Sequence, residues 1–508
     1  MGRIRTAACL VAVLVIAPFL PGATNEARVI KPEDVKHHVD KFNALDDERV
    51  VNLIPNAKAW EWMTAQVPLF TCPDKQLEEM YYFRWWTYRK HIKQLDFICL
   101  TEFLPRENPV SSAVGHHIRE GRWIHDNRYL DEYLLYWLRG KDGKPHDVQN
   151  FSSWTVWAAH QRYLVNHDKA FIVGMLDDFL RDYQGWEAKR LAPEGLYWQF
   201  ESRDAMEDSI NGDRKAENRR PSISSYMFGN AQAIAAVGRL AGKPDVAAVY
   251  DAKAASIKKA VQEQLWDAEA KFFKVRWKDG RLSDAREAIG FIPWYFELPD
   301  RGYEAAWKQL TDEQGFWAPV GLTTAERRHP GFRTHGSGHS CEWDGAVWPF
   351  ATAQTLTAMA NVLNDYPQTF VTKEDYLKAL QAYARCQQMD GKPYIGEYLD
   401  EKTGEWLRND KERGRHYNHS TFCDLIISGL VGVHPRDDDS VDVRPLVPPN
   451  TWEWFCLDNV RYHGRLLTVV CDRNGKHFGR GAGLTVFVDG KAVAHSDDLI
   501  NLHAPLSP

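Results

Sequence analysis

AQAIAAVGRLAGKPDVAAVYDAKAASIKKAVQEQL, residues 231–265, contains two apolar patterns of helical period with a short turn between them. In the second pattern, apolar side chains recur every three or four residues from Val246 to Leu265, as in a helix with one buried face. Pro244 is favoured in the first turn of a helix, and Gly242 is favoured just after the end of the preceding one. The stretch therefore predicts an αα-hairpin.

The same pattern of helical apolar periods separated by short turns extends from about residue 75 to residue 430. Helical periods are found at 127–138, 152–164 and 169–183, in a segment that begins at Pro349, and after Thr372, which with Asp375 forms an N-cap pair. Long segments rich in Trp, Gly and charge separate the helix pairs, at 191–227, 315–348 and 391–417. Loops of this length in a compact domain are usually functional. We therefore expect a mainly α fold in which helical hairpins gather their loops over a central cleft.

The last 75 residues have a sequence pattern typical of β-strands rather than helices. Residues 441–446, 465–470 and 484–488 alternate or are rich in β-branched side chains, and Asp489-Gly490 is a hairpin signal. We predict a small antiparallel β domain at 434–508. The expected organisation is a signal peptide at 1–23, an N-terminal extension at 24–74, a helical catalytic domain at 75–433, and the β domain.

The N-terminus predicts export. Arg3 and Arg5 precede an apolar run, and small residues near Ala23 provide a cleavage site. The alternative, a membrane anchor, is disfavoured because the run is shorter than the roughly 20 apolar residues of a spanning helix. A secreted or periplasmic protein without a membrane partner is expected after cleavage.

Composition narrows the range of partners. The net charge of −6 argues against nucleic acid or an anionic membrane as the main partner. Twenty Trp and twenty Tyr provide aromatic rings for the core and for a sugar-binding cleft. Eight scattered cysteines without CxxC spacing predict neither a zinc site nor a dense disulfide framework, although one pair could bridge. No metal or cofactor is expected, because His116-His117 and residues 416–419 lack further ligands nearby.

Two loops supply the paired carboxyl groups that glycoside hydrolysis requires. Residues 197–209 carry four carboxylates beside Trp198 and Arg203, and crowded like charges raise the pKa of at least one of them. Residues 392–406 carry Glu397, between Gly396 and Tyr398, and Glu405. Between these loops lie two Trp and two carboxylates in residues 342–349.

Four blocks resemble those of the six-hairpin glycosidases, the clan of trehalase, the processing α-glucosidases of glycoside hydrolase family 63, and mannosylglycerate hydrolase. In chain order they are EGRWIHD at 120–126, MEDS at 206–209, WDGAVWP at 343–349 and EYLDEKTG at 397–404. The resemblance spans about residues 116–430 and implies an (α/α)6 toroid. It also implies inversion at the anomeric carbon of an α-glucoside or α-mannoside, with exo action expected because long loops tend to close a pocket.

The resemblance nominates site residues. It places Glu207 at the general acid, where the clan normally has Asp, so Asp204 and Asp208 stay as alternatives. Glu397 is nominated as the base, with Glu405 as a rival. The expected substrate-binding residues are Arg122, Trp123, Asp126, Trp198, Arg203, Trp343, Asp344, Trp348, Tyr398 and His416.

Two other functions fit the sequence. A polysaccharide lyase on a similar toroid would use groups such as Tyr226, Arg415 and His416 to abstract a proton. A carbohydrate-binding protein without activity would keep the aromatic cleft, and Glu207 in place of the usual Asp keeps that alternative open.

Overall fold

The computed structural model describes residues 28–212, 214–334, 341–408 and 411–507, so the predicted signal peptide lies outside the described residues. The helices are α1 (Pro32–Leu45), α2 (Ala59–Gln66), α3 (Lys75–Lys90), α4 (Val114–Gly121), α5 (Arg128–Leu138), α6 (Thr155–Asn166), α7 (Lys169–Gly174), α8 (Leu176–Arg190), α9 (Pro221–Leu240), α10 (Pro244–Gln264), α11 (Ile292–Tyr295), α12 (Pro349–Asp365), α13 (Lys373–Cys386), α14 (Lys411–Gly414) and α15 (Phe422–Asp424). A π-helical segment, η8 (Leu425–Leu430), continues α15.

The strands form two principal sheets and several two-stranded ribbons. They are β1 (Leu69–Thr71), β2 (Ile92–Gln94), β3 (Ile98–Leu100), β4 (Trp198–Gln199), β5 (Asn218–Arg219), β6 (Trp266–Asp267), β7 (Phe272–Phe273), β8 (Gln388–Met389), β9 (Lys392–Pro393), β10 (Val433–Pro435), β11 (Ser440–Val443), β12 (Trp454–Tyr462), β13 (Arg465–Asp472), β14 (Gly483–Val488), β15 (Lys491–Ser496) and β16 (Leu502–Pro505).

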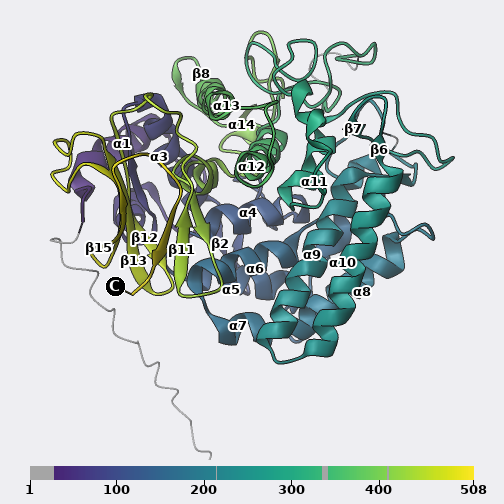
Figure 1. Ribbon diagram of the computed structural model, residues 1–508, viewed down its shortest axis with the longest axis horizontal. Coiled ribbons are helices and arrows are strands. Elements are labelled where there is room, and N and C mark those ends of the chain that lie inside the picture. The colour runs from purple at the N-terminus through teal and green to yellow at the C-terminus, as the bar shows by residue number, and fades with distance from the viewer. Residues whose placement is uncertain (1–27, 213, 335–340, 409–410, 508) are drawn as a thin grey trace, which may run out of the picture.

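The predicted hairpin is present as α9 and α10, which pack along each other (Figure 1). Helix α9 begins at Pro221, earlier than its apolar pattern indicates, and this shortens the expected loop at 191–227. The single helix predicted at 169–183 is instead two helices, α7 and α8, which meet at Met175. Thr372 and Asp375 form a complete capping box at the start of α13, as predicted.

Six of the helical elements close a cycle. Helix α4 contacts α6, α6 contacts α9, α9 contacts α11, α11 contacts α12, and α12 contacts η8, whose preceding turn α15 contacts α4. Helices α8 and α10 pack outside α9, and α13 and α3 pack outside α12 and α15. The inner helices are lined by apolar and aromatic side chains, among them Trp154, Tyr226 and Phe350. The closed cycle leaves the connecting loops to meet at the ends of the helices.

The C-terminal β domain is present as predicted, with a sheet in the order β1-β12-β13-β14-β15 beside a smaller β10-β11-β16 sheet. Both sheets are antiparallel. Strand β1 comes from the expected N-terminal extension, yet it pairs with β12, Leu69 lying opposite Asp458. Asp489 and Gly490 form the two-residue turn between β14 and β15 with φ angles of 49° and 78°, as the hairpin signal predicts.

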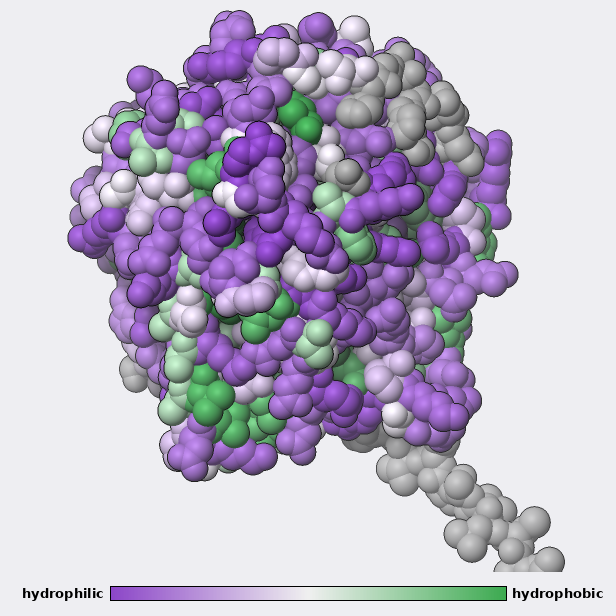
Figure 2. All heavy atoms as spheres, turned by 90° about the vertical axis from the view of Figure 1, so that its right-hand side faces the viewer, coloured by the Kyte–Doolittle hydropathy of each residue, from purple (hydrophilic) through white to green (hydrophobic). Residues whose placement is uncertain are grey.

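The face shown in Figure 2 is mainly hydrophilic, with hydrophobic residues in small separated groups. Among the described residues, no helix combines the length and hydropathy that crossing a bilayer requires. The seven cysteines of the described part of the chain are all free thiols.

Candidate active site

The two principal carboxyl candidates, Glu207 and Glu397, line the same cavity of about 810 Å³. Trp343, Trp348 and Arg203 also line it. Segments far apart in the sequence therefore converge as expected from the long loops, and the cavity is of the size that small-molecule ligands occupy.

The loop that presents Glu207 is held by its other carboxylates. Asp204 is buried and forms an ion pair with Arg220, whose Nε lies 2.7 Å from Oδ2. Glu201 accepts hydrogen bonds from the backbone N–H and the hydroxyl of Ser209, at 3.2 and 3.0 Å. Asp204 and Glu201 therefore hold the conformation of the loop by these contacts. Asp204 does not line the cavity.

The backbone turns sharply on both sides of Glu207. Ala205 and Asp208 have φ angles of 59° and 56°, a region that residues with a Cβ rarely adopt. Asp208 lies 3.5 Å from Arg214 in an ion pair and does not line the cavity. Strain of this kind is concentrated at functional sites, where surrounding contacts hold it.

Glu207 and Glu397 have different electrostatic environments. The pKa of Glu207 is raised to about 7, chiefly by burial and to a smaller extent by the charge of Glu102. Glu397 is 4% exposed and forms an ion pair with Arg408. A neighbouring guanidinium favours the ionised form of a carboxyl group. Glu207 thus keeps a substantial protonated fraction at neutral pH, whereas Glu397 is paired with a cation.

Three stacked rings connect the two carboxyl segments. Trp348 stacks between Trp343 and Tyr398, with ring centroids at 4.5 and 4.6 Å. The backbone N–H of Trp343 donates to the carbonyl of Glu207 at 3.2 Å. Tyr398 directly follows Glu397, so the stack fixes the two acids relative to each other, while Trp343 and Trp348 line the cavity.

Several expected site residues lie elsewhere. Arg122 and Trp123 are buried and both donate to Asp424, at 3.0 and 2.7 Å. Arg122 lines a separate cavity of about 500 Å³. Asp126 pairs with Arg128 at the surface, at 2.7 Å. Arg122 and Trp123 thus belong to the helical core, where they bind Asp424, and Asp126 lies at the surface, where it pairs with Arg128. None of the three lines the Glu207 cavity.

The remaining candidates are also outside the cavity. Glu405 is 70% exposed and faces Lys411. Trp198 is covered by the guanidinium of Arg190, which lies 4.3 Å from the centroid of its ring. Asp344 is fully buried, and its carbonyl accepts from the backbone of Arg333.

The lyase candidates are not brought together. His416 and Arg415 line a different cavity, and Asp46 lies 3.6 Å from His416. Burial lowers the pKa of His416 to about 4. Tyr226 is buried, and its hydroxyl lies 2.8 Å from the side-chain amide of Gln354, which donates to it.

Sequence reasoning missed Glu102 and Arg408, both of which line the cavity. Glu102 accepts hydrogen bonds from Tyr417 and from Ser112, the latter at 3.2 Å. Burial raises its pKa. Glu102 precedes every block of the resemblance, so no local signal distinguishes it. Arg408 could have been predicted, because it is a cation that lies eleven residues after the predicted base, Glu397.

Comparisons with known proteins relate the chain to glycoside hydrolases. Residues 106–420 match the mannosylglycerate hydrolase MGH1-like glycoside hydrolase domain, and residues 435–495 match the C-terminal domain of glycosyl hydrolase family 65. A solved structure named sialidase is 49% identical, with a TM-score of 0.93 over 95% of this chain. The chain spans only 45% of that protein's length.

Two further solved structures share the fold at low identity. The GH78 family rhamnosidase of Bacillus sp. GL1 is 13% identical over 79% of this chain and 40% of its own, with a TM-score of 0.60. An uncharacterised conserved protein from Thermus thermophilus is 13% identical over 69% of this chain and 100% of its own, with a TM-score of 0.53. Since the family match covers more than half of the chain, the chain belongs to the family of the mannosylglycerate hydrolase MGH1-like glycoside hydrolase domain.

Proposed function

We propose that this protein hydrolyses an α-glycosidic bond at the end of a glycan, with inversion, and that an α-glucoside or an α-mannoside is its substrate. The observation that carries the proposal is the pairing of Glu207 and Glu397 in one cavity. Two carboxyl groups in different surroundings, Glu207 with a raised pKa and Glu397 beside the guanidinium of Arg408, are suited to act as acid and base.

The proposed reaction needs one proton donor and one proton acceptor. Glu207 protonates the glycosidic oxygen as its bond to the anomeric carbon breaks. Glu397 accepts a proton from the water that attacks the same carbon from the opposite face, so that Glu207 ends ionised and Glu397 protonated. Inversion requires the two carboxyl groups to be about 6.5–9.5 Å apart, which leaves room for the water.

Other cavity residues are assigned supporting roles. Arg408 holds the carboxylate of Glu397 by their ion pair. Trp343 and Trp348 line the cavity and offer apolar surface to the C–H groups of a sugar, Trp348 only by its ring edge because Trp343 and Tyr398 cover both of its faces. A cavity of about 810 Å³ accommodates a few sugar units rather than a long chain, and this supports exo action.

Two broader features belong to the same proposal. The closed cycle of α4, α6, α9, α11, α12 and η8 supports an inner ring of six helices, and hence an (α/α)6 toroid. The N-terminal pattern supports export to the periplasm or the medium, which N-terminal sequencing of the protein from cell fractions tests directly.

Activity assays with aryl α-glucosides, aryl α-mannosides and the matching disaccharides test the mechanism, with the product anomer followed by NMR. We expect the β-anomer to appear first. Glu207→Gln and Glu397→Gln should each lower kcat by roughly a thousandfold or more with the natural leaving group, since general acid–base groups contribute on the order of 10²–10⁴. Glu405→Gln, a change at an exposed carboxylate of the same loop as Glu397, is the matched control and should retain activity.

Each element of the proposal has its own contradicting result. Full activity in both Glu207→Gln and Glu397→Gln would contradict the assignment of these residues as acid and base. Initial release of the α-anomer would contradict inversion, and cleavage of only β-linked or other sugars would contradict the substrate. A product with a new double bond would show that the bond is broken by elimination, as in a lyase, and not by hydrolysis.

A further inference from the structure

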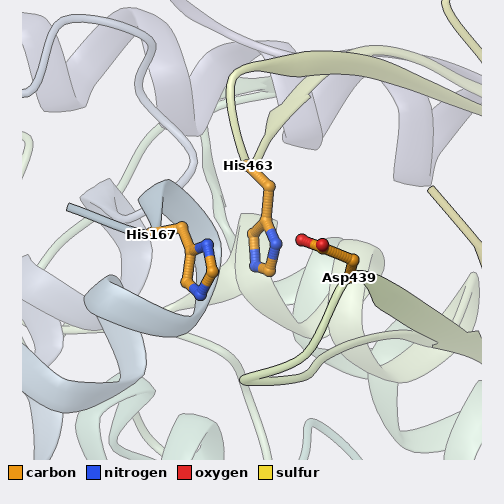
Figure 3. Close-up of side chains that lie close together, drawn as sticks. All are labelled: His167, Asp439 and His463. Carbon is orange, nitrogen blue, oxygen red and sulfur yellow. The ribbon is translucent and has the colours of Figure 1, made fainter. Parts of the chain in front are cut away.

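Two histidines and an aspartate from three separate segments meet where the helical part of the chain contacts the C-terminal β domain (Figure 3). His167 follows α6, Asp439 lies between β10 and β11, and His463 lies in the turn between β12 and β13. One potential ligand atom of each lies within 4.8 Å of the other two. None of the three lines the cavity of Glu207, so the proposed hydrolysis does not use them.

The hydrogen bonds of the two rings determine which nitrogen is free. Nε2 of His463 lies 3.0 Å from the carbonyl of Leu164, and Nε2 of His167 lies 3.2 Å from the carbonyl of Asp437. A carbonyl only accepts, so each Nε2 carries the proton and each neutral ring keeps a lone pair on Nδ1. Metal-binding histidines are usually held in this way, with the second nitrogen donating to a carbonyl.

The Nδ1 atom of His463 is buried and has no hydrogen-bond partner within bonding distance in the described part of the chain. A buried nitrogen lone pair without a donor costs free energy, unless a ligand supplies the missing interaction.

The backbone and the charges around the cluster also suit a cation. His167 and His463 have φ angles of 56° and 48°, and the backbone N–H of His463 donates to the carbonyl of Val165 at 2.9 Å. Both turns are thereby fixed against each other. Asp439 ends a run of three aspartates, of which Asp438 is paired with Arg436.

We propose that His167, Asp439 and His463 bind a divalent transition-metal ion, for which zinc is the best match to two imidazoles and a carboxylate. The Nδ1 atom of each ring and one carboxylate oxygen are the ligands, and water completes the shell. The rings now stack in parallel with centroids 4.1 Å apart. Zinc–nitrogen bonds of about 2.0–2.1 Å require Nδ1 atoms roughly 3.3 Å apart, so binding tilts the rings out of this stack.

The metal joins α6 to two turns of the β domain, and we expect it to stabilise their contact. A ligand that binds only the folded protein raises its stability with ligand concentration. The effect is structural and does not involve the hydrolytic reaction, so its test is independent of the test of the proposed function.

Isothermal titration of the full-length, untagged protein with zinc chloride after EDTA treatment tests the site. We expect one zinc per chain, and at least tenfold weaker binding in Asp439→Asn and in His167→Asn. Asparagine is chosen at position 167 because it tolerates positive φ. His495→Gln removes another His–Asp pair, in which the two side chains lie 3.3 Å apart, and is the matched control.

Thermal unfolding provides the second measurement, with circular dichroism to establish that each variant is folded. Zinc should raise Tm in the wild type and in His495→Gln, but not in Asp439→Asn. The proposal is overturned if millimolar zinc does not bind, or if the wild type and both ligand variants bind it with equal affinity.

Discussion

The raised pKa of Glu207 makes a prediction that does not depend on knowing the substrate. Glu207 is half-buried at the wall of the cavity, and loss of solvent there raises its pKa from 4.5 to about 7. Its ionised form is therefore disfavoured in the folded protein. Glu207→Gln replaces it with a neutral group of the same shape, and the variant should gain stability over the wild type as the pH rises.

The sign and size follow from proton linkage. The folded state binds the proton more tightly than the unfolded state, so this stabilisation is fully present below pH 4.5 and is lost as the pH rises through 7. Glutamine mimics the protonated form at every pH. Relative to its value at low pH, the stability gain of Glu207→Gln should reach about 1.4 kcal/mol at pH 5.5 and about 3 kcal/mol at pH 7 and above, at 1.36 kcal/mol per pH unit.

Urea unfolding of the wild type and the variant between pH 4.5 and 8.5 measures this difference. Glu405→Gln, at a carboxylate that is 70% exposed, is the control and should change stability little at any pH. In the wild type, kcat/KM should also fall about tenfold per pH unit above pH 7, as the acid ionises. A stability difference that stays constant with pH would refute the argument that burial raises this pKa.

Three further variants separate structure from chemistry. Arg408→Met leaves the carboxylate of Glu397 buried without its partner, so we expect a drop in Tm together with at least a tenfold loss of kcat/KM, measured by calorimetry and kinetics. Asp204→Asn breaks a buried ion pair and should cost about 3–5 kcal/mol in urea unfolding; a variant of normal stability without activity would instead make Asp204 the acid. Glu102→Gln removes a charge that raises the pKa of Glu207, so the fall of kcat/KM at high pH should begin at lower pH, and an unchanged profile would show that Glu102 does not act on Glu207.

Local signals carried much of the fold. The apolar periods on either side of Gly242, the capping box at Thr372 and the Asp489-Gly490 turn were each predicted from the sequence and are present. Each depends on residues within a few positions of one another, whose backbone preferences are largely independent of the rest of the chain. The loops that carry Glu207 and Glu397 were singled out by their composition, and both acids line one cavity, while their catalytic role stays a prediction.

Long-range contacts decided the rest. No local pattern shows that β1 joins a sheet whose other strands begin at residue 454, or that Arg122 turns towards Asp424 and away from the Glu207 cavity. The sequence alone determined the α9–α10 hairpin, the start of α13, the β14–β15 turn and the acid-bearing loops. The tertiary structure alone decided which carboxylate of residues 201–208 is held by an ion pair and which is left facing the cavity, because burial and charge partners are supplied by residues distant in the chain.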